Sequence, residues 1–139
     1  MMLLWVLVAV VVVMMGYIRL APSAPVTWHK MPENSAGKPP ADKDFKNGAI
    51  RIIDAGADGL VRLDAVALAT PRTTRLFGSV AEGMVTYVTR TVVMGLPDYT
   101  TVRQDGDTLT IYARSRFGRS DLGVNRKRVQ GWIDALQAR

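Results

Sequence analysis

Residues 108–138 read TLTIYARSRFGRSDLGVNRKRVQGWIDALQA, a stretch in which an alternating pattern gives way to a helical one. Over residues 108–117 every second side chain is apolar or small, which predicts a strand with one buried and one polar side. The expected buried side is Leu109, Ile111, Ala113, Ser115 and Phe117, and the polar side is Thr108, Thr110, Tyr112, Arg114 and Arg116. Residues 121–138 then predict an amphipathic helix that begins at a Ser120 or Asp121 cap. Its expected core face is Leu122, Val129, Trp132, Ile133 and Leu136.

The preceding chain adds further strands and one more helix. Residues 48–54 alternate enough for a short strand, and residues 58–69 fit a helix. Residues 73–117 are rich in β-branched and aromatic side chains and contain the hairpin signal Asp105-Gly106, which indicates consecutive antiparallel strands. This order of elements predicts an α+β fold, in which two helices pack on an antiparallel sheet of about four to five strands.

The N-terminal segment is strongly apolar. Residues 1–18 carry no charged side chain, and as a helix they would span about 27 Å, close to the ~30 Å hydrocarbon core of a bilayer. We therefore expect residues 1–20 to be a transmembrane anchor rather than a cleaved signal peptide, which would have a basic start and a shorter apolar core. Residues 21–47 are proline-rich and predict a linker, and residues 48–139 are expected to form a single α+β domain. Trp28, inside the linker, either docks on the domain or lies at the membrane surface, and docking is the simpler expectation.

The composition excludes several kinds of active site. The chain has no cysteine, so disulfides, thiolate metal sites and thiol nucleophiles are excluded, and its single histidine, His29, lies in the predicted linker. We expect neither a metal nor a cofactor, and the lack of a His- or Cys-based constellation predicts that the protein is not an enzyme. The net charge is +6, and residues 110–139 hold seven cations against two acids. Phosphate head groups or an acidic protein surface suit this charge, whereas the membrane anchor argues against nucleic acid.

A group of arginines forms the candidate binding site. Arg114 and Arg116 lie two residues apart on the predicted strand, so they project from the same face. With Arg90 from a neighbouring strand they would line an anion-binding patch, because a guanidinium group binds phosphate or carboxylate through two N–H groups at once. The start of the last helix, at Ser120 and Asp121, would add free backbone N–H groups.

A purely structural role for the same arginines is the alternative. Arg114 and Arg116 would then pair with Asp98 and Asp121 and hold the sheet to the helix. The last helix carries three more cations, which we expect to form a solvated basic surface. They are Arg126, Lys127 and Arg128.

Three blocks of the sequence resemble a known family. They are residues 83–90 (GMVTYVTR), 94–99 (MGLPDY) and 114–128 (RSRFGRSDLGVNRKR). Together they are similar to bacterial and plastid proteins of the domain of unknown function 1499 family, over about residues 45–138. Residues 19–23 and Trp28-His29 also resemble the short membrane-anchored members from alphaproteobacteria. The resemblance implies a fold but no activity, because the family has no established one.

Two functions from different classes are compatible with these features. The first is a non-catalytic accessory or scaffold protein that is anchored in the bacterial inner membrane and docks on a larger membrane protein complex. The second is a module that binds an anionic ligand or lipid head group through the arginine patch. A short N-terminal anchor usually exports the domain after it, which favours a periplasmic location, although Arg19 and Lys30 after the anchor weakly favour the cytoplasm.

Overall fold

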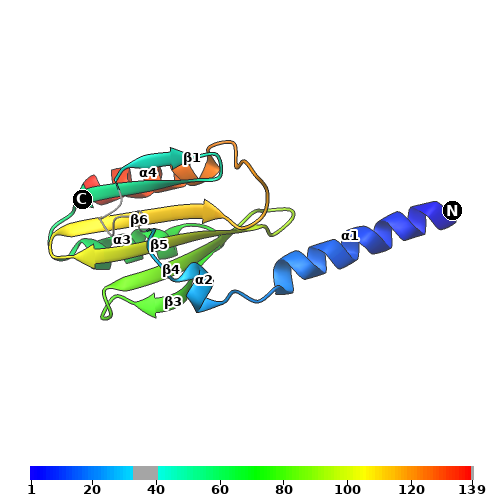
Figure 1. The fold of residues 1–139 in the computed structure, drawn as a ribbon, viewed down its shortest axis with the longest axis horizontal. Coiled ribbons are helices and arrows are strands. Elements are labelled where there is room, and N and C mark those ends of the chain that lie inside the picture. Colours follow the sequence, from blue (N-terminus) through cyan, green and yellow to red (C-terminus); the bar gives the residue numbers. More distant parts are fainter. Residues whose placement is uncertain (33–40, 139) are drawn as a thin grey trace.

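The computed structural model describes residues 1–32 and 41–138, which form a long N-terminal helix followed by one domain (Figure 1). The elements, in chain order, are α1 (Met2–Leu20), α2 (Pro25–Trp28), β1 (Lys43–Phe45), β2 (Gly48–Asp54), α3 (Gly59–Ala69), β3 (Thr73–Ser79), β4 (Met84–Arg90), β5 (Pro97–Asp105), β6 (Thr108–Ser115) and α4 (Val124–Gln137). In the described part of the chain the strands form one six-stranded sheet, in the order β1-β2-β6-β5-β4-β3. The predicted α+β class is confirmed, with six strands rather than four to five.

All pairings within this sheet are antiparallel. The predicted hairpin joins β5 to β6, with Asp105 opposite Thr108. Gly106 lies in its tight turn at a φ of 57°, a conformation that glycine adopts without the strain a side chain would cause. Strand β6, with its alternating pattern, lies in the middle of the sheet, between β5 and β2.

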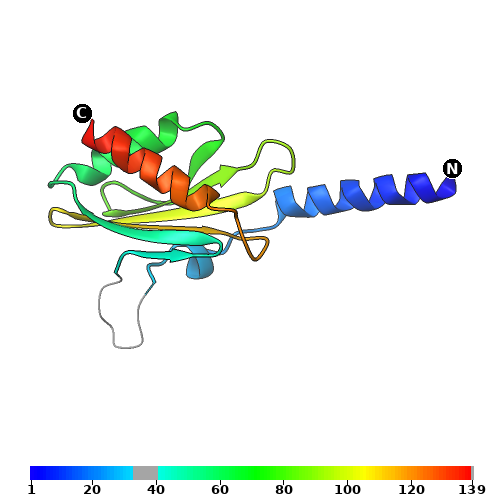
Figure 2. The same ribbon diagram turned by 90° about the horizontal axis from the view of Figure 1, so that it is seen from above.

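Helices α3 and α4 cover one face of the sheet (Figure 2). The apolar side of β6 points towards them as the alternation predicts, and Ile111 and Ala113 have no exposed surface. The core between sheet and helices is Leu60, Leu63, Val66, Ala67, Val85, Tyr87, Val102, Leu109, Ile111, Ala113, Val129, Trp132, Ile133 and Leu136. Burial of apolar surface thus accounts for the packing of this face.

The start of α4 differs from the prediction. The helix begins at Val124 rather than at residue 121, and Gly123 is its N-cap. Leu122, expected on the core face, is 91% exposed, because it precedes the helix in a left-handed backbone conformation and does not follow the helical periodicity. Asp121 still accepts hydrogen bonds from the backbone N–H groups of Gly123 and Asn125, at 2.8 and 2.9 Å.

The described part of the segment predicted as a linker, residues 21–47, contains two ordered elements. One is β1, whose side chains are all exposed and which pairs with β2 through its backbone, so its side-chain pattern gives no strand signal. The other is the single turn of α2, which begins at Pro25. Two of the prolines on which the linker prediction rested, at positions 39 and 40, lie outside the described residues.

Residues 21–32, which we call the strap, cross the face of the sheet opposite the two helices. Figure 2 shows α2 on the far side of the sheet from α3 and α4. Met31 is buried, and Trp28 and His29 are partly buried against the sheet. Trp28 therefore docks on the domain, and the strap covers the part of this face that β4, β5 and β6 form.

Helix α1 projects away from the domain (Figure 1). Of its side chains only Ile18 is buried, and its mean hydropathy is 2.4 over an 18-residue window. By length and composition α1 could cross a membrane, a property that signal sequences share.

Candidate functional site

The predicted arginine patch lies on the strap-covered face of the sheet. The register places Tyr99 of β5 opposite Arg114 of β6, and Thr101 opposite Tyr112. Thr86 of β4 faces Thr101 and hydrogen-bonds to it, with 2.9 Å between the two hydroxyl oxygens. The alternation of three adjacent strands thus builds a floor of aromatic rings and hydroxyl groups around the arginines.

Arg114 binds the strap rather than a carboxylate. Its guanidinium donates to the backbone carbonyl oxygen of Trp28 and, at 2.8 Å, to the hydroxyl of Thr101. Its central carbon lies 4.3 Å from the ring centroid of Tyr112 and 5.6 Å from that of Trp28. Arg114 is 6% exposed, and burial lowers its pKa to about 10, so it keeps its charge at neutral pH. The carbonyl oxygen and the two aromatic faces replace the water that the cation has lost.

Trp28 is the apolar part of the same contact. Its ring stacks on Tyr99, with centroids 4.2 Å apart and an angle of 23° between the planes. The carbonyl oxygen of Trp28 also accepts a hydrogen bond from Thr101 at 3.1 Å. Next to it, Nδ1 of His29 lies 2.7 Å from the hydroxyl oxygen of Thr86. One turn of the strap is therefore held by stacking and by hydrogen bonds to its backbone.

Arg116 and Arg90 hold neighbouring parts of the chain in the same way. Arg116 donates to the carbonyl oxygen of Pro22 at 3.0 Å and to the hydroxyl of Tyr99 at 3.2 Å. Arg90 donates to the carbonyl oxygen of Gly95 at 2.9 Å and lies 3.5 Å from that of Ile18 in the last turn of α1. The three arginines of the predicted patch therefore lie on one face of the sheet. Their hydrogen-bond partners, however, are carbonyl and hydroxyl oxygens of the chain.

The alternative pairing of Arg114 and Arg116 with acids is wrong. Among the described residues, the partner of Asp98 is Arg128, at 3.1 Å from guanidinium nitrogen to carboxylate oxygen, and both side chains are largely buried. Arg128 was expected on a solvated helix surface, but its guanidinium reaches Asp98 at the start of β5. Of the other two cations predicted there, Lys127 is exposed, and Arg126 is exposed and lies 3.6 Å from Asp44.

At the start of α4 the backbone N–H groups of Leu122, Gly123 and Asn125 already have partners within the chain. Ser120 accepts a hydrogen bond from the backbone N–H of Leu122, and Asp121 accepts those of Gly123 and Asn125. Burial acts to raise the pKa of Asp121, but the hydrogen bonds from Asn125 and Gly123 outweigh it and keep that pKa below its ordinary value. An internal carboxylate already occupies this helix start.

A buried polar network connects the blocks that carry the family resemblance. Asp98 accepts a hydrogen bond from Ser115 at 2.7 Å, and the amide of Asn125 donates to Ser115 and to Asp121, both at 2.9 Å. Arg128 donates to the side-chain oxygen of Asn125 at 2.9 Å. Asn125 has no exposed surface. The network joins the start of β5, the end of β6 and the start of α4, so this part of the signature is structural.

A second buried carboxylate, Asp64 on α3, is also saturated. It accepts hydrogen bonds from Tyr87 at 2.7 Å and from Nε of Arg75 at 2.8 Å. The hydrogen bond from Arg75, against burial and with help from Tyr87, holds the pKa of Asp64 below its ordinary value. Burial raises the pKa of Tyr87, and the Asp64 carboxylate adds to that effect. Asp64 and Tyr87 thus belong to one hydrogen-bonded group that joins α3 to β3 and β4.

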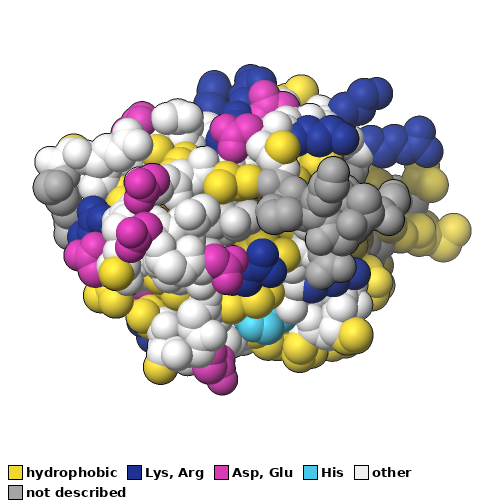
Figure 3. Space-filling view, turned by 60° about the vertical axis from the view of Figure 1, so that its left-hand side comes forward, with side chains coloured by type: hydrophobic (Ala, Val, Ile, Leu, Met, Phe, Trp, Pro, Cys, Tyr) yellow, Lys and Arg dark blue, Asp and Glu magenta, His cyan; other side chains and the backbone are white. Residues whose placement is uncertain are grey.

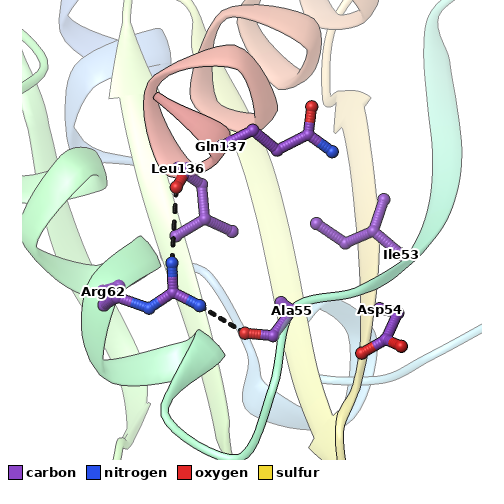
Figure 4. A pocket seen from close by; sticks show the side chains of 6 residues that line it. All are labelled: Ile53, Asp54, Ala55, Arg62, Leu136 and Gln137. Carbon is purple, nitrogen blue, oxygen red and sulfur yellow. Dashed lines mark hydrogen bonds between the residues drawn. The ribbon is translucent and has the colours of Figure 1, made fainter. Parts of the chain in front are cut away.

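A small pocket of about 220 Å³ lies between the end of β2 and the end of α4 (Figure 4). Arg62 points into this pocket from α3. It donates to the backbone oxygens of Leu136, at 3.3 Å, and of Ala55. This guanidinium ties α3 to the end of α4 and to the loop after β2. Within the described residues, moreover, no three acidic or histidine side chains lie close enough together to hold a metal ion.

The turns at the two ends of the sheet differ in charge, a feature that the strand-by-strand prediction missed. The turns far from α1 carry Asp54, Asp58, Glu82, Asp105 and Asp107. In Figure 3, where that end is turned towards the viewer, acidic side chains are spread over it and cations gather along the upper edge. The turns next to α1 carry Lys46, Arg72, Arg116, Arg119 and the partly buried Asp121. The charges can be read from the sequence, but the strand order must be known before each turn can be assigned to one end of the sheet.

A comparison with known protein families gives a match over most of the chain. A family model described as protein of unknown function (DUF1499) matches residues 21–136. The matched range begins before the predicted resemblance and includes the strap as well as the sheet. No curated protein and no solved structure matches the chain.

Proposed function

The chain belongs to the DUF1499 family of proteins of unknown function, and from that premise we propose that it is a non-catalytic accessory protein of a membrane protein complex. In this proposal α1 anchors the chain in the bacterial inner membrane as a single span. The domain docks on a larger partner in the same membrane and acts there as a subunit or scaffold.

The observation that carries the proposal is the attachment of α1 and the strap to the domain. Arg19, at the end of α1, donates to the carbonyl oxygen of Val93 at 3.2 Å, and Tyr17 packs edge-on against Phe117 at 6.2 Å between centroids. Arg114 and Arg116 then fix the strap. A flexible linker would let the domain rotate freely, whereas this attachment gives it one orientation relative to α1. A fixed orientation suits a protein that presents one surface to a neighbour.

The first experiment is native purification of the tagged full-length chain from membranes. We expect a species much larger than the monomer, and recovery of the monomer alone would contradict the proposal. Trp28→Ala should still insert through α1 but lose the partner, because the strap no longer fixes the domain. Lys127→Ala, which changes an exposed cation outside the strap, is the matched control.

We place the domain in the periplasm, because a short N-terminal anchor usually exports the domain after it. The absence of cysteine makes a direct test simple. Asp107→Cys should react with a membrane-impermeant maleimide added to intact spheroplasts. Reaction only after lysis would place the domain in the cytoplasm.

The second candidate, an anion-binding module at Arg90, Arg114 and Arg116, has less support. Arg114 is buried, and its donors already serve the strap and the floor of the sheet. An anion at that position would have to displace Trp28. A ligand of this class fits better beside α1, where arginines line an open cavity.

A further inference from the structure

A cavity of about 370 Å³ lies beside the end of α1 and is lined by three arginines. Arg19 comes from α1, Arg72 from the turn before β3, and Arg90 from the end of β4. Val88 and Val92 contribute apolar walls, and no carboxylate is among the lining residues. Segments far apart in the sequence thus bring three cations to one cavity.

Each of these guanidiniums is oriented by a backbone carbonyl oxygen. Arg72 donates through Nε to the carbonyl of Arg90 at 3.0 Å, Arg90 to that of Gly95 at 2.9 Å, and Arg19 to that of Val93 at 3.2 Å. Among the described residues, none of the three forms an ion pair with an acid. The charge in the cavity is therefore not neutralised by the described part of the chain.

The length of α1 indicates how deep the cavity would lie relative to a bilayer. Helix α1 has 19 residues and is about 28 Å long, so nearly all of it is needed to cross a hydrocarbon core of ~30 Å. Tyr17 and Arg19, in its last turn, contact Phe117 and Val93. The loop between β4 and β5 consequently lies level with the boundary between head groups and acyl chains.

The tip of that loop is apolar and exposed. Val92 and Val93 are 70% and 74% exposed, next to the cavity that the three arginines line. Figures 1 and 2 both show this loop, residues 91–96, reaching alongside the end of α1. Apolar tips beside cations are the combination that suits a bilayer surface containing anionic lipid.

We propose that the cavity formed by Arg19, Arg72 and Arg90 binds the phosphate of an anionic phospholipid while Val92 and Val93 enter the acyl boundary. The ligand belongs to the bilayer that α1 crosses, so the inference rests on the proposed membrane anchoring. Guanidinium groups suit the phosphate because they donate two N–H groups at once. The apolar wall of Val88 and Val92 favours a lipid over free phosphate.

The depth of the loop can be measured on the full-length chain in nanodiscs. Single cysteines at Val93, at Val10 in α1 and at Asp107 in the far turn would carry an environment-sensitive fluorophore, with nitroxide lipids as quenchers. We expect quenching at Val93 and Val10 but not at Asp107. If Val10 is quenched and Val93 is as water-exposed as Asp107, the inference is overturned and the anchor stands. If Val10 is not quenched, both are overturned.

The lipid site is tested by a charge-removing variant that keeps the backbone. Arg72 has a φ of 58°, and asparagine accepts that conformation more readily than most residues, so Arg72→Asn is the variant of choice. In nanodiscs that contain phosphatidylglycerol, native mass spectrometry should find this lipid retained about tenfold less by Arg72→Asn than by the wild type. Lys127→Asn is the matched control and should retain it normally.

Two further experiments test whether the planar guanidinium is needed and whether the site binds a lipid or free phosphate. Arg72→Lys keeps the charge without the planar fork and should give intermediate retention. Inorganic phosphate added to the protein in phosphatidylglycerol nanodiscs should not displace the bound lipid. Full competition by inorganic phosphate, or equal retention by Arg72→Asn and Lys127→Asn, would overturn the lipid site.

Discussion

The two faces of the sheet are covered in different ways. Towards α3 and α4 the strands contribute apolar side chains that are almost completely buried. Towards the strap they contribute aromatic rings, hydroxyl groups and arginines. Hydroxyl and guanidinium groups there donate hydrogen bonds to backbone carbonyl oxygens of the strap. The first face gains its stability from burial of apolar area, whereas hydrogen bonds on the second face select one position of the strap. Stability and orientation are thus provided by opposite sides of the same strands.

Neighbouring residues on β6 give the sharpest test of this difference. Ile111 has no exposed surface and faces the helices, whereas Tyr112 faces the strap. Ile111→Ala should lower the free energy of unfolding by about 2–5 kcal/mol, because it leaves a cavity in a packed core. Tyr112→Ala should cost about 1 kcal/mol, chiefly through its contact with Arg114. Denaturant unfolding in detergent, followed by near-ultraviolet circular dichroism, measures both, and equal losses would contradict the division between the faces.

The strap should come loose without unfolding the domain. Trp28→Ala removes the stack on Tyr99 and its buried area, a loss of about 1–2 kcal/mol confined to residues 21–32. Hydrogen exchange should therefore speed up in the strap and stay unchanged in the core strands. Limited proteolysis should find a new cleavage site before residue 32. Global unfolding of this variant would show that the strap is part of the core.

Lowering the pH should also affect the two faces of the sheet differently. The hydrogen bond from Arg75 keeps the folded-state pKa of Asp64 below its unfolded value. Its contribution to stability is therefore complete above the ordinary carboxyl range and is lost as the pH falls through the folded-state pKa. Asp64→Asn should flatten the loss of stability below about pH 4, measured as the unfolding midpoint against pH. Exchange in the strap should change little over the same range, because the partners of Arg114 and Arg116 are not carboxylates.

Local patterns predicted much of the fold. The alternation of β6, the hairpin at Asp105-Gly106 and the helix that became α3 each follow from neighbouring side chains. The exposed strand β1 was missed, because it is ordered by backbone pairing with β2 rather than by its own side chains. The early helix start was wrong because a left-handed turn at Leu122 separates Asp121 from α4.

The candidate site was harder to predict than the fold. The sequence correctly placed Arg114 and Arg116 on one face, since this needs only the two-residue period of a strand. It could not show that their partners are carbonyl oxygens, because every residue has one and no side-chain pattern marks those that are used. The cavity of Arg19, Arg72 and Arg90 was missed for a related reason, since its parts are brought together by the topology.

The smallest expected effect concerns Arg116, and it asks whether charge or geometry holds the strap. Arg116 is partly exposed and donates to Pro22 and Tyr99, so Arg116→Ala should cost about 0.5–1 kcal/mol. Amide exchange in residues 21–32 should then rise about two- to fivefold, well below the effect of Trp28→Ala. Arg116→Lys keeps the charge but not the fork, so recovery by lysine would mean that charge suffices. If lysine behaves like alanine, the planar guanidinium that reaches both Pro22 and Tyr99 sets the position of the strap, as the contacts of Arg114 also indicate.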